Sequence, residues 1–159
     1  MPISVTVLGL GNVLLSDEGV GVRLMERVRD ARPWPPEVEF VDGGAGGLNL
    51  LNVIERAERL VVFDAADMGL QPGQCRVIAP DQFAEESPQR RISLHDVSFA
   101  ETLDLCGRFF RKPDTIKVLA IQPATIDYGL QLSDAIDAAM PNLVAAAMGL
   151  IDEVRSART

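Results

Sequence analysis

The stretch that decides the fold is ISVTVLGLGNVLLSDEGVGVRLMERV, residues 3–28. Its first part is rich in β-branched residues and predicts a strand over residues 3–8. Gly9 and Gly11 then predict a tight turn, and the spacing of apolar residues after the turn predicts a helix over about 17–30. A strand, a glycine-rich turn and a helix in this order are typical of the start of an α/β domain with a parallel sheet.

The rest of the chain continues this alternation. The other expected strands are 38–41, 60–63, 75–79 and 116–121, and the other expected helical segments are 48–57, 94–109 and 133–157. Residues 75–79 follow the preceding strand after a turn too short for a parallel crossover, so this strand is expected to be antiparallel and at an edge. Pro141 is expected to begin a second helix within the last segment.

These elements predict a single α/β domain over residues 1–159. It should contain three layers: a twisted, mostly parallel five-stranded sheet with one antiparallel edge strand, and helices on both faces. Loops rather than long linkers connect the elements, and no internal repeat divides the chain.

Composition excludes several classes of protein. The chain has 159 residues and a net charge of −8, with 47% hydrophobic residues, which argues against binding to nucleic acid or to anionic membranes. The sequence shows no signal-peptide pattern and no apolar run of the roughly 18 residues that a membrane span needs, so a cytoplasmic protein is expected. Cys75 and Cys106 suit neither a disulfide framework nor a zinc site and are expected to be small buried hydrophobes. A monomer is expected, because no self-complementary apolar patch is apparent.

The glycine turn does not fit a dinucleotide site. Such a site needs Gly-x-Gly-x-x-Gly, but Leu14 occupies the position of the third glycine. Asp17 and Glu18 also open the following helix, where their charges would repel a pyrophosphate. Asp17 is expected to be a helix cap, whereas Glu18, which glycine and valine residues follow, is the better functional candidate.

Acidic residues follow two of the expected strands directly. Asp42 and Asp64 each end an apolar run, and ligands of open α/β sheets bind at the carboxyl ends of strands. His95 is the only histidine and lies at the start of an expected helix. Each residue alone is more often structural. Together, Glu18, Asp64 and His95 would suit zinc, nickel or another first-row dication, with water completing the shell.

Other hydrolytic sites are poorly supported by the sequence. There is no Gly-x-Ser-x-Gly elbow and no His-Glu-x-x-His motif, and neither cysteine lies in a glycine-rich or electropositive setting. A hydrolase built on this chain would have to rely on metal polarisation or on paired carboxylates.

Four motifs, in this order, resemble those of the hydrogenase maturation endopeptidases. They are GLGNVLLSDEGVG (9–21), VDGG (41–44), VFDA (62–65) and SLHD (93–96). The resemblance extends from the first expected strand through Gln122-Pro123-Ala124 to the terminal helical segment. One departure is Ala45, where some relatives have threonine. Members of this family trim the C-terminus of the [NiFe]-hydrogenase large-subunit precursor, so the resemblance implies a processing endopeptidase, a class often described as aspartic-type.

The resemblance also implies roles for particular residues. In this family a glutamate, an aspartate and a histidine that match Glu18, Asp64 and His95 contact the metal, and the aspartate that matches Asp42 is implicated in catalysis. The nickel is carried by the substrate, although a surrogate ion such as cadmium or zinc could occupy the site. Whether the nucleophile is a metal-activated water or a water assisted by Asp42 stays open.

Two other functions compete with this interpretation. One is a non-catalytic metal-binding chaperone that assembles the same precursor. The other is a nucleotide-dependent oxidoreductase, which Leu14 and Glu18 already disfavour.

Overall fold

The computed structural model describes residues 4–44, 50–80 and 94–157, and within the last range it describes side chains from residue 102 onward. The strands are β1 (Val5–Leu10), β2 (Val38–Gly44), β3 (Arg59–Ala65), β4 (Cys75–Ile78) and β5 (Thr115–Ile121). The helices are the 3-10 helix η1 (Ser16–Gly19), α1 (Val20–Ala31), α2 (Leu51–Arg56), α4 (Leu94–Phe109) and α5 (Asp134–Ser156).

The five strands form one sheet in the order β2-β1-β3-β5-β4. The first four strands in this order are parallel to one another, and β4 pairs antiparallel with β5 at the edge. The prediction of a mostly parallel sheet with one antiparallel edge strand is therefore confirmed. The turn before β4 contains Gly69 and Gly73 at φ values of 69° and 90°, a backbone conformation that glycine adopts without strain.

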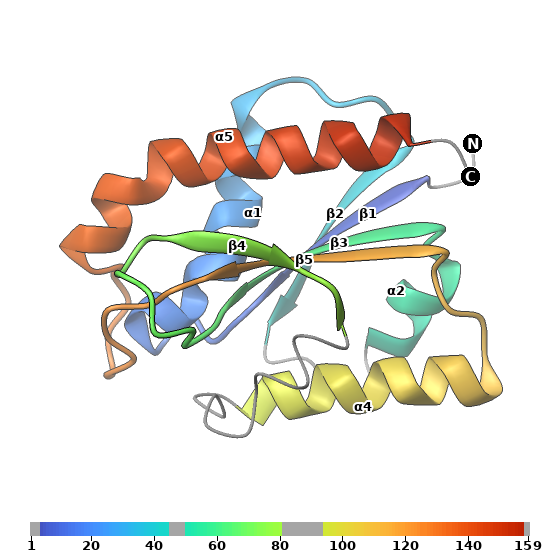
Figure 1. The fold of residues 1–159 in the computed structure, drawn as a ribbon, viewed down its shortest axis with the longest axis horizontal. Helices are drawn as coiled ribbons and strands as arrows, with labels where there is room; N and C mark the ends of the chain where they lie inside the picture. The colour runs from blue at the N-terminus through green and yellow to red at the C-terminus, as the bar shows by residue number, and fades with distance from the viewer. Residues whose placement is uncertain (1–3, 45–49, 81–93, 158–159) are drawn as a thin grey trace.

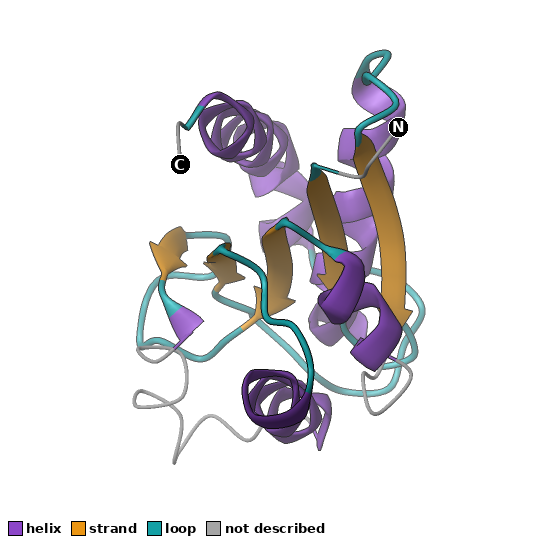
Figure 2. Ribbon diagram, turned by 90° about the vertical axis from the view of Figure 1, so that its right-hand side faces the viewer, coloured by secondary structure: helices purple, strands orange, loops and turns teal. Residues whose placement is uncertain are grey.

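Helices cover both faces of the sheet, which confirms the predicted three layers (Figures 1 and 2). Side chains alternate along β3, so Val61 and Phe63 belong to the core under α1 and α5. Leu60 and Val62 belong to the second core, which includes residues of α2 and α4. Because β1 and β3 are buried on both faces, both are apolar at nearly every position.

The last helix differs from the prediction. Pro141 lies inside a single 23-residue helix, α5, so the expectation that it begins a second helix is wrong. Proline removes the backbone bond to Asp137, but both residues are exposed, so water can reach the carbonyl oxygen of Asp137. The apolar stripe of α5 continues past the proline from Ile136 to Val154 and packs on the sheet. This burial outweighs the lost hydrogen bond.

The length and composition of α5 would also allow it to cross a membrane, contrary to the expectation that no segment would. One such helix is weak evidence for a membrane protein, because core helices of soluble proteins pass the same test. In this fold the apolar face of α5 covers the sheet.

The elements around the carboxyl edge also begin and end differently from the prediction. The first helical segment is divided into η1 and α1, and β2 and β3 extend far enough to include Asp42 and Asp64. The expected start of the second helix at residue 48 lies outside the described residues. Both cysteines are free, and Cys106 is buried as expected, whereas Cys75, in the edge strand β4, is only half-buried.

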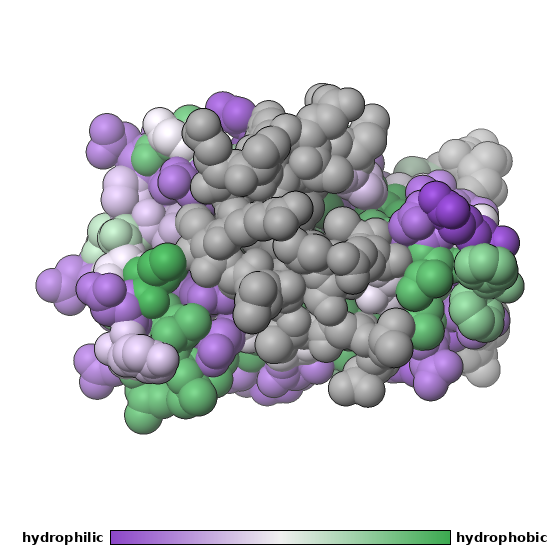
Figure 3. Space-filling model, turned by 90° about the horizontal axis from the view of Figure 1, so that it is seen from below, coloured by the Kyte–Doolittle hydropathy of each residue, from purple (hydrophilic) through white to green (hydrophobic). Residues whose placement is uncertain are grey.

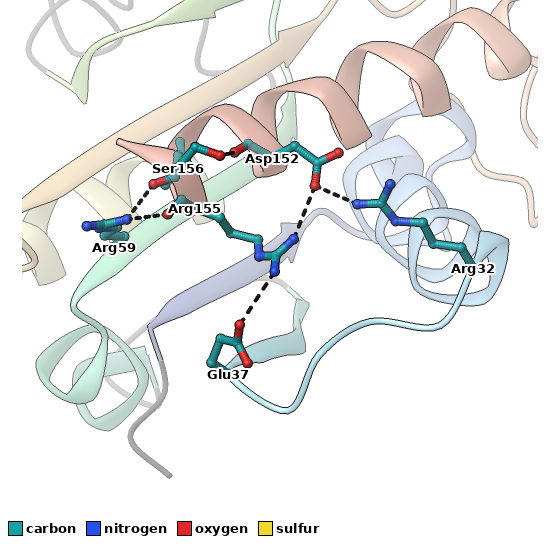
Figure 4. Close-up of polar contacts among 7 residues, drawn as sticks. Arg32, Glu37, Arg59, Asp152, Arg155 and Ser156 are labelled. Atoms are coloured by element: carbon teal, nitrogen blue, oxygen red, sulfur yellow. Dashed lines mark hydrogen bonds and ion pairs between the residues drawn. The ribbon is translucent and has the colours of Figure 1, made fainter. Parts of the chain in front are cut away.

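Polar contacts anchor the end of α5 at the opposite edge of the sheet (Figure 4). Arg59, at the start of β3, donates to two carbonyl oxygens in the last turn of α5, at 2.7 and 2.9 Å. Arg155 of α5 donates to Glu37, at 3.4 Å, and Arg32 pairs with Asp152. These contacts fix α5 to β3, to the segment before β2 and to the end of α1.

Candidate active site at the carboxyl edge of the sheet

Glycine residues bring η1 and α1 against the ends of the two central strands. A methyl group at Gly21 would overlap the carbonyl oxygens of Leu10 and Phe63. Gly11, at a φ of 140°, lies as closely against the backbone of Glu18. The glycines of the first motif therefore allow a close backbone approach that places η1 beside β1 and β3. The tight turn that was predicted at Gly9 and Gly11 begins later than expected, because Gly9 lies inside β1.

Asp17 is buried and connects η1 to the segment between β5 and α5. Its Oδ2 accepts hydrogen bonds from the backbone N–H groups of Ala124, at 2.9 Å, and Thr125, at 3.1 Å. Ser133 donates to the same carboxylate from its N–H and its hydroxyl, both at 2.7 Å. The N-cap residue of η1 is Leu15, and among the described residues no side chain forms a cap hydrogen bond to this helix. The expectation that Asp17 caps its own helix is therefore wrong, because its carboxylate is used by a distant segment instead.

Glu18 and Asp64 are buried carboxylates at the same edge of the sheet. Glu18 is 2% exposed and Asp64 is fully buried. Glu18 belongs to η1, which contacts β3, and Asp64 is the penultimate residue of β3. The alternation along β3 places Asp64 on the same face as Leu60 and Val62, the face that α2 and α4 cover. Carboxylates in such a low-dielectric setting attract a cation more strongly than exposed carboxylates do.

Figure 1 shows how α4 is placed relative to the strands of the sheet. The helix lies beneath the sheet and its first turn is on the side of the molecule where β3 and β5 end. His95 is the second residue of α4, but its side chain lies outside the described residues. Among the side chains that are described, no three histidine, cysteine, aspartate or glutamate residues gather in a cluster. The backbone thus brings the helix that contains His95 to the face on which Asp64 lies.

Asp42 occupies a different position from Glu18 and Asp64. It is paired with Gly9 in the sheet, across β1 from β3. Its side chain is exposed, and Oδ1 accepts a hydrogen bond from the N–H of Gly44, at 2.8 Å. The alternation along β2 places it on the face of Phe40, which packs with the core under α1 and α5. Asp42 is therefore at the same edge as Asp64 but on the other face of the sheet.

A pocket beside this edge was not predicted from the sequence. It has a volume of about 320 Å³ and is lined by Asp67 and residues 122–126. The buried Gln122 organises its wall, since Oε1 accepts from the N–H groups of Met68, at 2.7 Å, and Leu70, at 3.2 Å, and Nε2 donates to Asp67, at 3.1 Å. The one sequence feature that could have indicated this pocket is the polar Gln122, which directly follows an apolar strand. The sequence alone does not show that the Gln122 side chain is buried and binds the backbone of the pocket wall.

Known proteins with similar sequences belong to one family. Residues 22–150 match the family model described as "HycI: Hydrogenase maturation protease". The chain is 36% identical to the hydrogenase expression/formation protein HupD of Bradyrhizobium diazoefficiens, over 83% of this chain and 69% of that protein. It is 37% identical to HoxM of Cupriavidus necator, over 88% of this chain and 70% of that protein.

Solved structures agree with these sequence matches. The hydrogenase maturating endopeptidase HybD of Escherichia coli superposes with a TM-score of 0.79 and 26% identity, covering 94% of this chain and 93% of that one. The [NiFe] hydrogenase maturation protease HybD of Thermococcus kodakarensis gives a TM-score of 0.74 at 25% identity, covering 92% of this chain and 98% of that one. The chain therefore belongs to the hydrogenase maturation protease family, which is a family of peptidases.

Proposed function

We propose that this protein is an endopeptidase that removes the C-terminal extension of a [NiFe]-hydrogenase large-subunit precursor after nickel insertion. In this proposal Glu18, Asp64 and His95 contact the nickel that the precursor holds, and the protein needs no resident metal. The observation that carries the proposal is the burial of Glu18 and Asp64 at the edge of the sheet toward which α4 directs its first turn.

The three proposed ligands, Glu18, Asp64 and His95, suit a metal ion that is bound only transiently, because the nickel must leave with the processed precursor. Two carboxylates and one imidazole supply fewer than the four protein ligands of a closed structural site. A nickel ion that already has ligands in the precursor could therefore accept them as additional ligands. Imidazole is a good ligand for nickel, and the two buried carboxylates would offset its positive charge.

The cleavage itself needs a water molecule and a base. Nickel held between the two proteins would polarise the scissile carbonyl group or lower the pKa of a bound water. Asp42 is the candidate base, because it is exposed at the same edge and its Oδ1 bond to the N–H of Gly44 fixes its orientation. Its location on the other face of the sheet means that the substrate would have to pass over the end of β1 to reach both groups.

The direct test is a cleavage assay with purified precursor in nickel-loaded and nickel-free forms. Loss of the C-terminal extension, measured by intact-protein mass spectrometry, is expected only for the loaded form. If the loaded precursor is bound but never shortened, the protein is the non-catalytic assembly chaperone instead. Cleavage of the nickel-free form at the same rate would show that nickel has no part in recognition.

Substitutions separate the metal contacts from the base. Glu18→Gln, Asp64→Asn and His95→Ala are each expected to abolish cleavage and to weaken cadmium binding to the free protein in calorimetric titrations. Asp42→Asn is expected to abolish cleavage while cadmium binding is retained. Glu26→Gln, on the solvent side of α1, is the matched control and should behave as wild type. A fully active His95→Ala variant would remove His95 from the site.

The proposed function also suggests where the protein acts and in which oligomeric state. A cytoplasmic monomer is proposed, since the precursor must be processed as a soluble protein before it joins its partners. The net charge of −8 makes a nucleic-acid partner a poor alternative.

A further inference from the structure

Four large apolar side chains are exposed beside the candidate active site. Leu14 is 55% exposed, Ile126 37%, Tyr128 91% and Leu130 66%. Single exposed apolar residues are normal on a protein surface, but a group of them marks an interaction site. We call these four residues the apolar rim.

Backbone hydrogen bonds join the two segments that form the apolar rim. Gly129 donates to the carbonyl oxygen of Leu14, at 2.9 Å, and Ser16 donates back to the carbonyl oxygen of Gly129, also at 2.9 Å. Tyr128 and Leu130 flank Gly129 in sequence, so both lie next to the segment that contains Leu14. The hydrophobic surface at the left end of Figure 3 is at the end of the molecule where these segments lie in Figure 1.

The apolar rim is held in one conformation by polar contacts beneath it. Asp17 binds the N–H groups of Ala124 and Thr125, as described above, and the hydroxyl of Ser16 donates to the carbonyl oxygen of Asp127, at 2.7 Å. A surface that is ordered before binding loses less conformational entropy on association than a mobile loop does. Tyrosine is also among the residues that contribute most to protein interfaces.

We propose that the apolar rim is the docking surface for the folded body of the precursor, which would contact it through an apolar patch of its own. This proposal rests on the proposed function. Leu14 directly precedes Leu15, whose carbonyl oxygen accepts a hydrogen bond from the N–H of Glu18, at 3.1 Å. Ile126 lines the pocket at the same edge. A protein whose tail enters at Glu18 and Asp64 therefore has to place its adjoining surface over the apolar rim.

The test compares two sets of serine substitutions at exposed apolar residues. The rim variant combines Leu14→Ser, Tyr128→Ser and Leu130→Ser. The control combines Phe109→Ser and Phe110→Ser, which are also exposed but lie at the far end of α4. Steady-state cleavage of nickel-loaded precursor is measured for both. The rim variant is expected to raise KM at least tenfold with little change in kcat, whereas the control should stay within about twofold of wild type.

Three results would overturn the proposal. In the first, the rim variant has the KM of wild type. In the second, the KM of the control variant rises as much as the KM of the rim variant. In the third, wild type is a dimer in analytical ultracentrifugation, the rim variant is a monomer and KM is unchanged, which would assign the surface to a second copy of this chain. If the triple variant does not fold, Tyr128→Ser alone replaces it, because a side chain that is 91% exposed contributes little to folding.

A binding measurement separates the failure of this inference from the failure of the proposed function. The precursor, with and without nickel, is immobilised and the affinity of each variant is measured by surface plasmon resonance. If wild type binds but does not cleave, the proposed function fails while the rim variant still tests docking. Equal affinities of wild type and the rim variant would refute docking at this surface even if cleavage is observed.

Discussion

The carboxylate of Asp17 accepts hydrogen bonds from both the N–H and the hydroxyl of Ser133, each at 2.7 Å and across 116 residues of sequence. Ser133 in turn caps α5, since its hydroxyl oxygen accepts from the N–H of Ile136, at 3.4 Å. One buried carboxylate therefore joins the segment that contains Glu18 to the first turn of the longest helix.

Replacing Asp17 with asparagine should destabilise the protein by about 3 kcal/mol. The amide has one oxygen instead of two and directs its NH2 group at backbone and hydroxyl donors, so buried donors lose their acceptor. Urea unfolding followed by circular dichroism measures the change. Asp30→Asn is the control, because Asp30 forms an exposed ion pair with Arg29 and its substitution should change stability much less than Asp17→Asn does. Equal stabilities of the two variants would contradict the assigned role.

Gly21→Ala should destabilise the fold and, under the proposed function, weaken cadmium binding at Glu18 and Asp64 as well. The added methyl group would overlap the carbonyl oxygens of Leu10 and Phe63, so α1 and the preceding η1 must move away from the sheet. We expect a loss of about 2 kcal/mol or more in the free energy of unfolding and weaker cadmium binding in titrations.

Gly149→Ala is the matched control for Gly21→Ala. A methyl group at Gly149 meets open space on α5, so alanine should stabilise the helix by about 0.5–1 kcal/mol. Stabilisation by Gly21→Ala as well would disprove the close approach.

Pro141→Ala should raise the free energy of unfolding by about 1–3 kcal/mol. Alanine supplies the N–H that proline lacks inside α5, and the position is exposed, so no packing is lost. Thermal and urea unfolding measure the change. A lower stability would indicate that proline's restriction of the unfolded chain is worth more than the missing hydrogen bond.

Burial raises the pKa of the Cys75 thiol above its ordinary value of 9.0. In a Cys106→Ala variant, the alkylation rate of Cys75 should therefore reach its midpoint above pH 9.0, and at about 9.0 after unfolding in urea. The folded state keeps the proton to a higher pH than the unfolded state does. The free energy of unfolding should thus fall as pH rises from 9.0 toward the folded-state pKa. Coinciding midpoints would show that the thiol is not desolvated.

The sheet could be predicted because its strands have strong local signals. β3 is apolar over consecutive residues, which indicates a central parallel strand, and the short turn before β4 left only an antiparallel pairing. Pro141 was misassigned because local propensity was weighed without the long apolar stripe of α5, whose burial depends on the tertiary structure.

The positions of the candidate site residues were predictable in part. Glu18 and Asp64 could be selected from their positions beside glycines and at a strand end, and both are buried at one edge. The role of Asp17 could not, because its partners are more than a hundred residues away and only folding brings them together. The face on which Asp42 lies could not be predicted either, since it depends on how far β2 extends.

The contact of Gly21 with β1 and β3 has a genetic consequence. A missense mutation at this codon would introduce a side chain where none fits, so we expect it to be lost from a population as readily as a missense mutation of Glu18 or Asp64. Variants of unknown effect in this family should therefore be classified by backbone proximity as well as by chemical role. A glycine without any reactive group can be as intolerant of substitution as a buried carboxylate of the candidate site.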